Sequence, residues 1–290
     1  MARNSERSTL VLFISRVLVL FLVGGLVAGF YTGCTADDGS GGSGGWDGGV
    51  GLDGSVGVDG SQNADGDLGY DAWTGGGDGS VDIPLRWLDW EGVVNARDVG
   101  GYAISTGETI RWGVLLRGGD LTNLSQAGCD AMELAGVVTV MDLREEATQQ
   151  NSPAPECVSV NAAIQPVSMP KLLPASEQNY LALMEQAEPV IPEMFDALAT
   201  AGGSPVYIHC VIGRDRASFA IALVMLALGA DRQTVLEDFR LSNDVGIGVT
   251  DSHLEAVLDE IESQGGIETY LTGLGVTQQE INAVREWALE

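Results

Sequence analysis

The hydrophobic positions from about residue 83 onward fall into two kinds of stretch. Two short ones, 137–144 (VVTVMDLR) and 206–210 (VYIHC), are apolar and rich in β-branched residues, which is typical of strands buried inside a parallel sheet. Longer stretches have the spacing and composition of helices. They occupy residues 124–136, 179–203, 216–230 and 277–290.

Two boundary signals support these helices. Ser125 stands at the start of the first helical stretch, where a serine side chain can cap a helix, and Gly229 follows the apolar third one. Strands that alternate with helices imply right-handed crossovers and a sheet covered on both faces. The pattern therefore predicts an α/β domain over residues 83–290, with a central, mostly parallel sheet flanked by helices.

The first 34 residues have the pattern of a secretory signal. Three arginines precede the apolar run 17–30, and small residues lie directly before Cys34. A basic region, a short apolar region and a small-residue cleavage site are the parts of such a signal. Because the residue at the cut is a cysteine, residues 1–34 resemble a bacterial lipoprotein signal, in which that cysteine is lipidated.

An uncleaved membrane anchor is the alternative for this segment. Tyr31 stands where lipoprotein signals usually carry Leu or another aliphatic residue. Counting back to Leu10 gives nearly enough apolar residues for a membrane span, although Arg16 interrupts them. In either case we expect the rest of the chain to lie outside the cytoplasm, anchored to a membrane in the periplasm or at the cell surface.

Residues 35–82 are expected to form a disordered, acidic, Gly-rich tether. The segment contains ten aspartates and no Lys or Arg, so it cannot bury enough apolar surface to offset the entropy of the chain. The EF-hand and RTX calcium-binding patterns are both absent. A plain linker is therefore favoured over a calcium site.

The charge balance excludes several classes of partner. The chain has 14 Lys and Arg against 41 Asp and Glu, a net charge of −27, which argues against nucleic acid. Lys171 is the single lysine, so there is no polybasic patch for a membrane surface. With two histidines and no C-x-x-C pair, we expect no metal and no cofactor. Any bound anion must be held locally, by a few arginines and backbone amides.

The stretch HCVIGRDRAS, residues 209–218, has the features of such an anion site. It runs from the end of a predicted strand through a short loop into a predicted helix, the place where α/β sheets bind ligands. Backbone N–H groups and the positive end of the helix favour an anion there, and Gly213 permits a tight loop. Arg216 can meet two phosphate oxygens with its planar guanidinium group.

The same surroundings suit Cys210 as a nucleophile. A helix N-terminus and nearby cations favour the thiolate, which can attack a phosphate in line and form a covalent thiophosphate. The phosphate would be held by the loop residues and by the arginine that ends the loop. We expect His209 to orient the loop by a hydrogen bond to backbone rather than to transfer protons. The expected phosphate-binding residues are Val211, Ile212, Gly213, Arg214 and Arg216.

This loop and several flanking segments resemble the cysteine-dependent protein tyrosine phosphatases. HCVIGRDRAS is similar to the HCxxGKDRTG loop of the bacterial tyrosine/serine phosphatases. Further similar segments follow the family's order: NARDVGGY, IRWGVLLRGGDL, VMDLREE, EDFRLSN and IETYLTGLGVTQQEI. The resemblance implies a phosphatase fold and hydrolysis of phosphotyrosine, or of both phosphotyrosine and phosphoserine, through a cysteinyl-phosphate intermediate.

The resemblance also implies a general acid. No W-P-D tripeptide is present, and in the similar subfamily the acid is the aspartate directly before the loop arginine, which corresponds to Asp215. A helix N-cap is the alternative role for Asp215. Two positions depart from the family pattern: Arg214 replaces a lysine, and Ala217 lacks a hydroxyl that Ser218 could supply instead.

Two other groups of side chains are left with open roles. Cys129 and Cys157 could form a disulfide, one of them could pair with Cys210 as a redox lock, or both could be buried small residues. Arg97, Arg117 and Arg144 could line the anion site or form structural ion pairs. Arg144 is the best supporting candidate, because it ends a strand at the same edge of the sheet as Cys210.

Three functions fit the sequence. The first is a phosphatase that acts on a phosphorylated protein or peptide. The second is a phosphatase for phosphoinositides or small molecules, with a phospholipid as partner. The third is a module that binds phosphorylated residues and turns them over poorly, which the alanine at position 217 suggests.

Overall fold

The structure is a computed structural model that describes residues 86–172 and 174–290. The expected signal segment 1–34, the lipidation site at Cys34 and the tether 35–82 lie outside the described residues. Within the described part of the chain, no helix is both long and apolar enough to cross a membrane.

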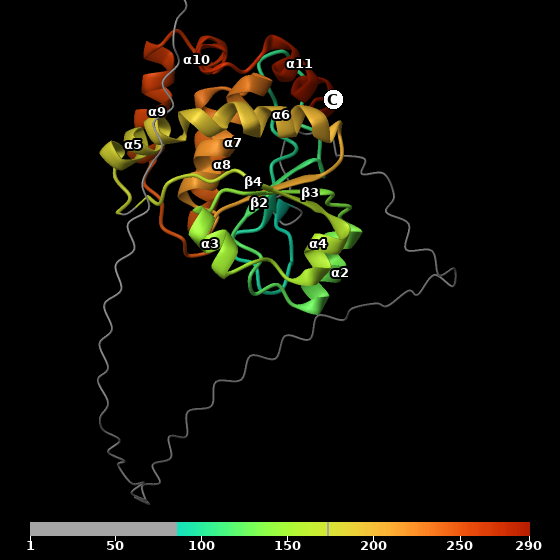
Figure 1. The fold of residues 1–290 in the computed structure, drawn as a ribbon. Coiled ribbons are helices and arrows are strands. Elements are labelled where there is room, and N and C mark those ends of the chain that lie inside the picture. The colour runs from blue at the N-terminus through green and yellow to red at the C-terminus, as the bar shows by residue number, and fades with distance from the viewer. Residues whose placement is uncertain (1–85, 173) are drawn as a thin grey trace, which may run out of the picture. The chain divides into compact units, whose positions relative to one another are not determined.

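A five-stranded sheet forms the centre of the domain (Figure 1). Its order is β1-β2-β5-β3-β4, with β1 antiparallel at one edge and the other four strands parallel. The strands are β1 (Arg97–Asp98), β2 (Leu115–Gly118), β5 (Val206–His209), β3 (Thr139–Asp142) and β4 (Ala163–Pro166). The predicted fold class, a mostly parallel sheet flanked by helices, is confirmed.

Strand β5 lies at the centre of the sheet. We call the edge at which its carboxyl end lies the functional edge. His209, its last residue, is in register with Gly118 of β2 and with Asp142 of β3. The carboxyl ends of three strands therefore meet at one place, where open α/β sheets bind their ligands. The two strands predicted from the sequence, within 137–144 and 206–210, are both present.

Helices cover both faces of the sheet, because neighbouring residues of one strand are buried on opposite sides. Leu115 and Ile208 belong to the larger core, which is shared with α5 to α11, whereas Leu116 and Tyr207 belong to a smaller core with α2 and α4 (Figure 1). The helices are α2 (Gln126–Leu134), α3 (Glu146–Asn151), α4 (Glu156–Asn161), α5 (Glu177–Ala187), α6 (Ile191–Ala201), α7 (Asp215–Leu228), α8 (Arg232–Arg240), α9 (Asp251–Ser263), α10 (Ile267–Leu274) and α11 (Gln278–Ala288).

The helical stretch 179–203 is divided where the sequence places prolines. α5 ends at Ala187, a 3₁₀ turn covers Glu188–Val190, and α6 follows with a proline in its first turn. A proline cannot donate a helical hydrogen bond, so it starts a new helix rather than continuing the old one. The two predicted boundary residues are confirmed: the Ser125 side chain accepts from the Gly128 N–H, and Gly229 ends α7 with φ 101°.

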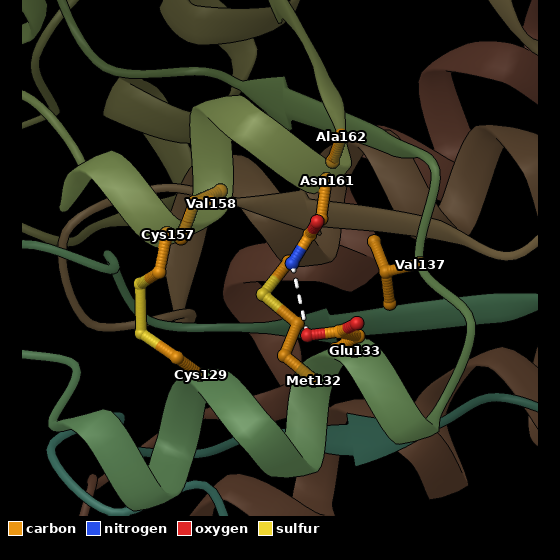
Figure 2. Close-up of a pocket in the computed structure, with 8 residues that line it drawn as sticks. All are labelled: Cys129, Met132, Glu133, Val137, Cys157, Val158, Asn161 and Ala162. Atoms are coloured by element: carbon orange, nitrogen blue, oxygen red, sulfur yellow. Dashed lines mark hydrogen bonds between the residues drawn. A yellow bond between two sulfur atoms is a disulfide. The ribbon is translucent and has the colours of Figure 1, made fainter.

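A disulfide between Cys129 and Cys157 joins α2 to α4 (Figure 2). Beside it, Asn161 of α4 donates a hydrogen bond of 3.1 Å to Glu133 of α2. Cys210 is a free thiol. The structure therefore selects the disulfide among the three roles that the sequence left open for these cysteines, and it excludes the lock with Cys210.

Removing this disulfide should destabilise the domain. The bond closes a loop between residues 28 positions apart, and cross-linking a loop of that length stabilises a fold by about 3 kcal/mol through the unfolded state. We expect the double variant Cys129→Ala/Cys157→Ala to lose free energy of unfolding of about that size, measured by urea denaturation. Wild-type protein unfolded under reducing conditions should show the same loss, and an unchanged midpoint in both would refute a stabilising bond.

Candidate active site

The predicted loop lies at the functional edge, between the end of β5 and the start of α7. Cys210 directly follows β5, and its side chain is buried. α7 begins at Asp215 and runs for 14 residues, so its positive end faces the loop. The strand, loop and helix follow each other as the sequence predicted.

The backbone carbonyls at the start of the loop, those of Cys210 and Val211, accept hydrogen bonds from groups that lie outside the loop. The Cys210 carbonyl lies 3.0 Å from His209 Nδ1, which donates to it in the tautomer with the proton on Nδ1. Burial lowers the pKa of His209, although Asp142 acts in the opposite direction, so the ring is neutral at neutral pH. The Val211 carbonyl accepts from the backbone N–H of Asp120 at 3.0 Å.

Asn95 and Arg117 hold the carbonyls in the middle of the loop. Asn95 Nδ2 donates to the Gly213 carbonyl at 3.1 Å and lies 3.3 Å from that of Ile212. Arg117 Nη2 donates to the Gly213 carbonyl at 2.7 Å. Asn95 has φ 59°, a left-handed conformation that asparagine tolerates better than most residues. The loop is therefore fastened to the segment before β1 and to β2.

The backbone N–H groups of the loop, unlike its carbonyls, are not bonded to neighbouring segments that the structure describes. Within residues 86–172 and 174–290, no acceptor is bonded to the backbone N–H groups of 211–216. Gly213 has φ 69°, and a Cβ there would lie 2.5 Å from the carbonyl carbon of Gly118. A side chain at this position would thus push the loop away from β2. The loop that follows Cys210 therefore carries a series of N–H donors available to a ligand, and such a backbone nest is suited to an oxyanion.

Arg216 is held at the edge of this nest by Glu145. Its Nη1 donates to the Glu145 carboxylate at 2.9 Å and lies near two backbone carbonyls. Burial is the largest single influence on the pKa of Glu145 and raises it, but the hydrogen bonds from its own N–H and from Arg216, with the positive charge of Arg216, together outweigh burial and lower the pKa. Within the described residues, Nε and Nη2 of Arg216 have no protein acceptor, so they are available to an anion. A guanidinium group fixed on one side and open on the other suits bidentate phosphate binding.

Asp215 faces Tyr180 and Arg214 and does not cap the helix. The N-cap position belongs to Arg214, and Asp215 is the first helical residue. Tyr180 donates to Asp215 Oδ1 at 2.7 Å, and Arg214 Nε contacts both carboxylate oxygens at 3.0 and 3.1 Å. The alternative interpretation of Asp215 as an N-cap was therefore wrong, because the carboxylate is turned toward side chains rather than toward its own helix amides.

A buried charge cluster of Arg97, Arg117 and Asp238 lies beneath the loop. Asp238, in α8, accepts from Arg97 at 3.0 Å and from Arg117, and all three side chains are inaccessible to solvent. Burial alone would raise the pKa of Asp238, but the two guanidinium groups outweigh it and hold the pKa far below its usual range. Burial, together with Arg97, lowers the pKa of Arg117 to about 10. Two cations against one anion leave a net positive charge under Cys210.

Of the two roles that the sequence left open for the arginines, the structure shows the ion pair. Arg97 and Arg117 form structural ion pairs rather than lining the anion site, although Arg117 also fastens the loop. Arg144 is engaged by Asp142 through Nε at 2.9 Å and Nη2 at 2.6 Å. It still lies near enough to Cys210, as Arg117 and Arg214 do, for a Coulombic interaction with a thiolate. Three cationic side chains therefore lie within electrostatic range of the Cys210 sulfur.

Comparison with known proteins decides the family. Residues 88–290 match the family model that is described as "Tyrosine phosphatase family". The chain belongs to the tyrosine phosphatase family. Two relatives are a Cupriavidus necator protein named "Putative tyrosine-protein phosphatase", 29% identical over 171 residues, and the "Triple specificity protein phosphatase PtpB" of Mycobacterium tuberculosis, 26% identical over 191 residues. These alignments cover 54% and 53% of this chain, and 63% and 68% of the relatives.

A third relative is a "Tyrosine-protein phosphatase" of Nostoc commune. It is 23% identical over 212 residues, which cover 59% of this chain and 72% of the relative. The chain spans less than two thirds of the length of the Cupriavidus protein. The resemblance that the loop motifs predicted is confirmed at the level of the family.

Ala217 is the main departure from the family-like loop, and the structure shows what surrounds it. The Ala217 side chain is part of the larger core. The Ser218 oxygen accepts from Arg117 Nη2 at 2.6 Å. No hydrogen bond joins Ser218 to the Cys210 sulfur in the part of the chain that the structure describes. The Ser218 oxygen is thus an acceptor within the buried charge cluster.

Four residues of the site were not singled out from the sequence. Asn95 and Asp238 lie in the family-like segments NARDVGGY and EDFRLSN, and Glu145 lies in VMDLREE, so those segments carried the signal. Tyr180 is an ordinary buried position of an amphipathic helix, and no local pattern distinguishes it. Beside it, His253 of α9 is half-buried, with its ring 5.6 Å from that of Tyr180.

Proposed function

We propose that this chain hydrolyses phosphate monoesters of tyrosine, and of serine as a second substrate, through a cysteinyl-phosphate intermediate. One observation carries the proposal. The loop from Cys210 to Arg216 is fastened by its carbonyls, and the N–H groups that follow the buried thiol have no acceptor among the described residues. Such a cradle has no evident structural purpose, because the N–H donors of a whole loop lack acceptors within residues 86–172 and 174–290.

In the first step the Cys210 thiolate attacks phosphorus while the bond to the leaving oxygen breaks. The loop N–H groups and the open side of Arg216 stabilise charge on the three equatorial oxygens. Asp215, in its protonated form, gives its proton to the leaving oxygen. In the second step the Asp215 carboxylate takes a proton from water, which attacks phosphorus and releases inorganic phosphate and the thiolate.

Replacing Asp215 by asparagine should affect poor leaving groups most. Phenolate is a much stronger base than p-nitrophenolate, so it depends more on a proton donor. We expect Asp215→Asn to lower kcat/KM for phenyl phosphate by about 10²–10³-fold, and for p-nitrophenyl phosphate by much less. Steady-state kinetics with both substrates measure the difference, and equal losses would remove Asp215 from the role of acid.

The substrate class can be tested by direct comparison. The mycobacterial relative is named for triple specificity, which supports assays with a phosphotyrosine peptide, a phosphoserine peptide and a phosphoinositide. We expect phosphotyrosine to be hydrolysed fastest and vanadate to inhibit. Fastest turnover of the phosphoinositide would instead make a phospholipid the substrate class.

A binding module is the second candidate, favoured by the surroundings of position 217. In this chain Ala217 offers no hydroxyl, and Ser218 is bonded to Arg117. If no group assists the release of phosphate from Cys210, the intermediate should persist. Phosphate binding without turnover of p-nitrophenyl phosphate by the reduced protein would support this function and refute the enzyme.

We also propose that the domain works outside the cytoplasm, tethered to a membrane by lipid on Cys34. The signal-like residues 1–34 support this, and so does the Cys129–Cys157 disulfide, since such bonds persist in oxidising compartments. Mass spectrometry of the membrane-extracted protein tests it. A lipid-modified N-terminus at Cys34 is expected, and an intact Met1 would contradict lipidation.

A further inference from the structure

Tyr180 contacts Asp215, the proposed general acid. It lies in α5, outside the loop motif at residues 209–218. Its hydroxyl donates to Asp215 Oδ1 at 2.7 Å, across 35 positions of sequence. The Tyr180 side chain is buried, with 1% of its surface exposed. Its ring packs 6.4 Å from Phe239 of α8 and 5.6 Å from His253 of α9, measured between ring centres. The hydroxyl is therefore held in place by helices on several sides.

The contacts of the two carboxylate oxygens are unequal. Oδ1 receives both the Tyr180 hydroxyl and Arg214 Nε, whereas Oδ2 receives Arg214 Nε alone, at 3.1 Å. An oxygen that accepts two hydrogen bonds is the less favourable place for a proton. Oδ2 is thus the oxygen that carries the proton in the acid form. A tyrosine that donates to Oδ1 can keep this bond in both protonation states of Asp215.

Tyr180 itself does not titrate in the working range. Burial, reinforced by the charge of Asp215, raises the pKa of Tyr180 far above its usual value. The hydroxyl therefore stays protonated and remains a hydrogen-bond donor at neutral pH. It does not release its proton during the reaction.

We infer that Tyr180 is a positioning residue that fixes the Asp215 carboxyl, with Oδ2 toward the leaving oxygen. The inference rests on the proposed role of Asp215 as general acid and deepens it. In the first step the Oδ2 proton passes to the leaving oxygen as the phosphorus–oxygen bond breaks, and in the second step Oδ2 takes a proton from water. Tyr180 makes and breaks no covalent bond in either step.

The test combines Tyr180→Phe with Asp215→Asn and two substrates. We expect Tyr180→Phe to lower kcat/KM for phenyl phosphate about tenfold, the effect of one hydrogen bond to a charged group, and for p-nitrophenyl phosphate less than about twofold. In the Asp215→Asn background the same change should alter neither rate by more than about twofold, because the group that it positions is gone. Equal losses with both substrates, or a tenfold loss that persists in that background, would overturn the inference.

Two controls separate positioning from a general loss of structure. Tyr270→Phe removes another buried hydroxyl, one with no hydrogen-bond partner among the described residues, and should leave both rates unchanged. Replacement of Tyr180 by 3-fluorotyrosine keeps the donor and should keep wild-type discrimination between the substrates, with a loss equal to that of Tyr180→Phe counting against the inference. Failure of the proposed function is distinguishable, because the wild-type protein would then turn over neither substrate. If Asp215 is not the acid, Asp215→Asn lowers kcat/KM equally for both substrates, whereas failure of the inference alone leaves the difference between the substrates intact.

Discussion

Cys210→Ser should abolish turnover while leaving the binding of oxyanions intact. A serine hydroxyl is not ionised at neutral pH and lacks the nucleophilicity of a thiolate, so the first chemical step has no attacking group. The cradle does not depend on the sulfur, because its carbonyls are held by Asn95, Arg117 and the Asp120 N–H. We expect a loss in kcat of at least about 10⁴-fold, comparable to the removal of a nucleophile in other hydrolases.

Phosphate or tungstate titration by calorimetry gives the matching measurement. The serine variant should bind the oxyanion within about a factor of ten of wild type, since removing a thiolate also removes a repulsive charge. Cys129→Ala/Cys157→Ala is the control for the loss of cysteines outside the loop, and its kcat should be close to wild type at a temperature where it is folded. Residual wild-type-like turnover in Cys210→Ser would remove Cys210 from the mechanism.

Asp238→Asn should cause the largest loss of stability of any single polar substitution in the site. The change leaves Arg97 and Arg117 buried without a counter-charge, and breaking a buried ion pair from one side costs about 3–5 kcal/mol. Urea denaturation measures the loss. Because Arg117 also donates to the Gly213 carbonyl, we expect phosphate affinity to fall in parallel with stability.

Asp259→Asn is the matched control for this substitution. Asp259 pairs with Arg232 at the surface, where 66% of its side chain is exposed, and such pairs contribute less than about 1 kcal/mol. Equal losses for the two variants would show that the buried cluster is not held by Asp238.

The same cluster gives a pH dependence of stability. The pKa of Asp238 is held well below its unfolded value, so its contribution is present above the unfolded pKa of about 4 and is lost as the pH falls through the folded pKa. Wild-type protein should therefore lose stability steadily on acidification below about pH 4. Asp238→Asn should lose less over that interval, because the group that titrates is absent.

The sequence allowed the two central strands and the order of the loop to be predicted, because both depend on local pattern. The apolar segments that end at Asp142 and His209 have the composition of buried strands, and the loop motif is contiguous. β2 was missed because Arg117 interrupts its apolar run. That arginine is buried, and the carboxylate that balances its charge belongs to Asp238, 121 positions away. β4 was missed because its four residues are exposed at the edge of the sheet.

The parts of the site that could not be predicted depend on contacts between distant segments. Glu145 faces Arg216 and Asn95 faces Gly213 because of how strands and helices cross, which no window of sequence records. The Asp215 carboxylate turned toward Tyr180 rather than toward its own helix for the same reason. The disulfide could be named from the sequence as one of three possibilities, and the packing of α2 against α4 decided among them.

The central claim is that a phosphoryl group is carried on the Cys210 sulfur during turnover. Acid quenching of the Asp215→Asn variant during the hydrolysis of p-nitrophenyl phosphate, followed by peptide mass spectrometry, tests this most directly. Loss of the group that activates water should make the intermediate accumulate. We predict a single added phosphoryl group on the peptide that contains Cys210, stable to acid and absent from Cys210→Ser. Turnover with the phosphoryl group on another residue, or without any covalent adduct, would contradict it.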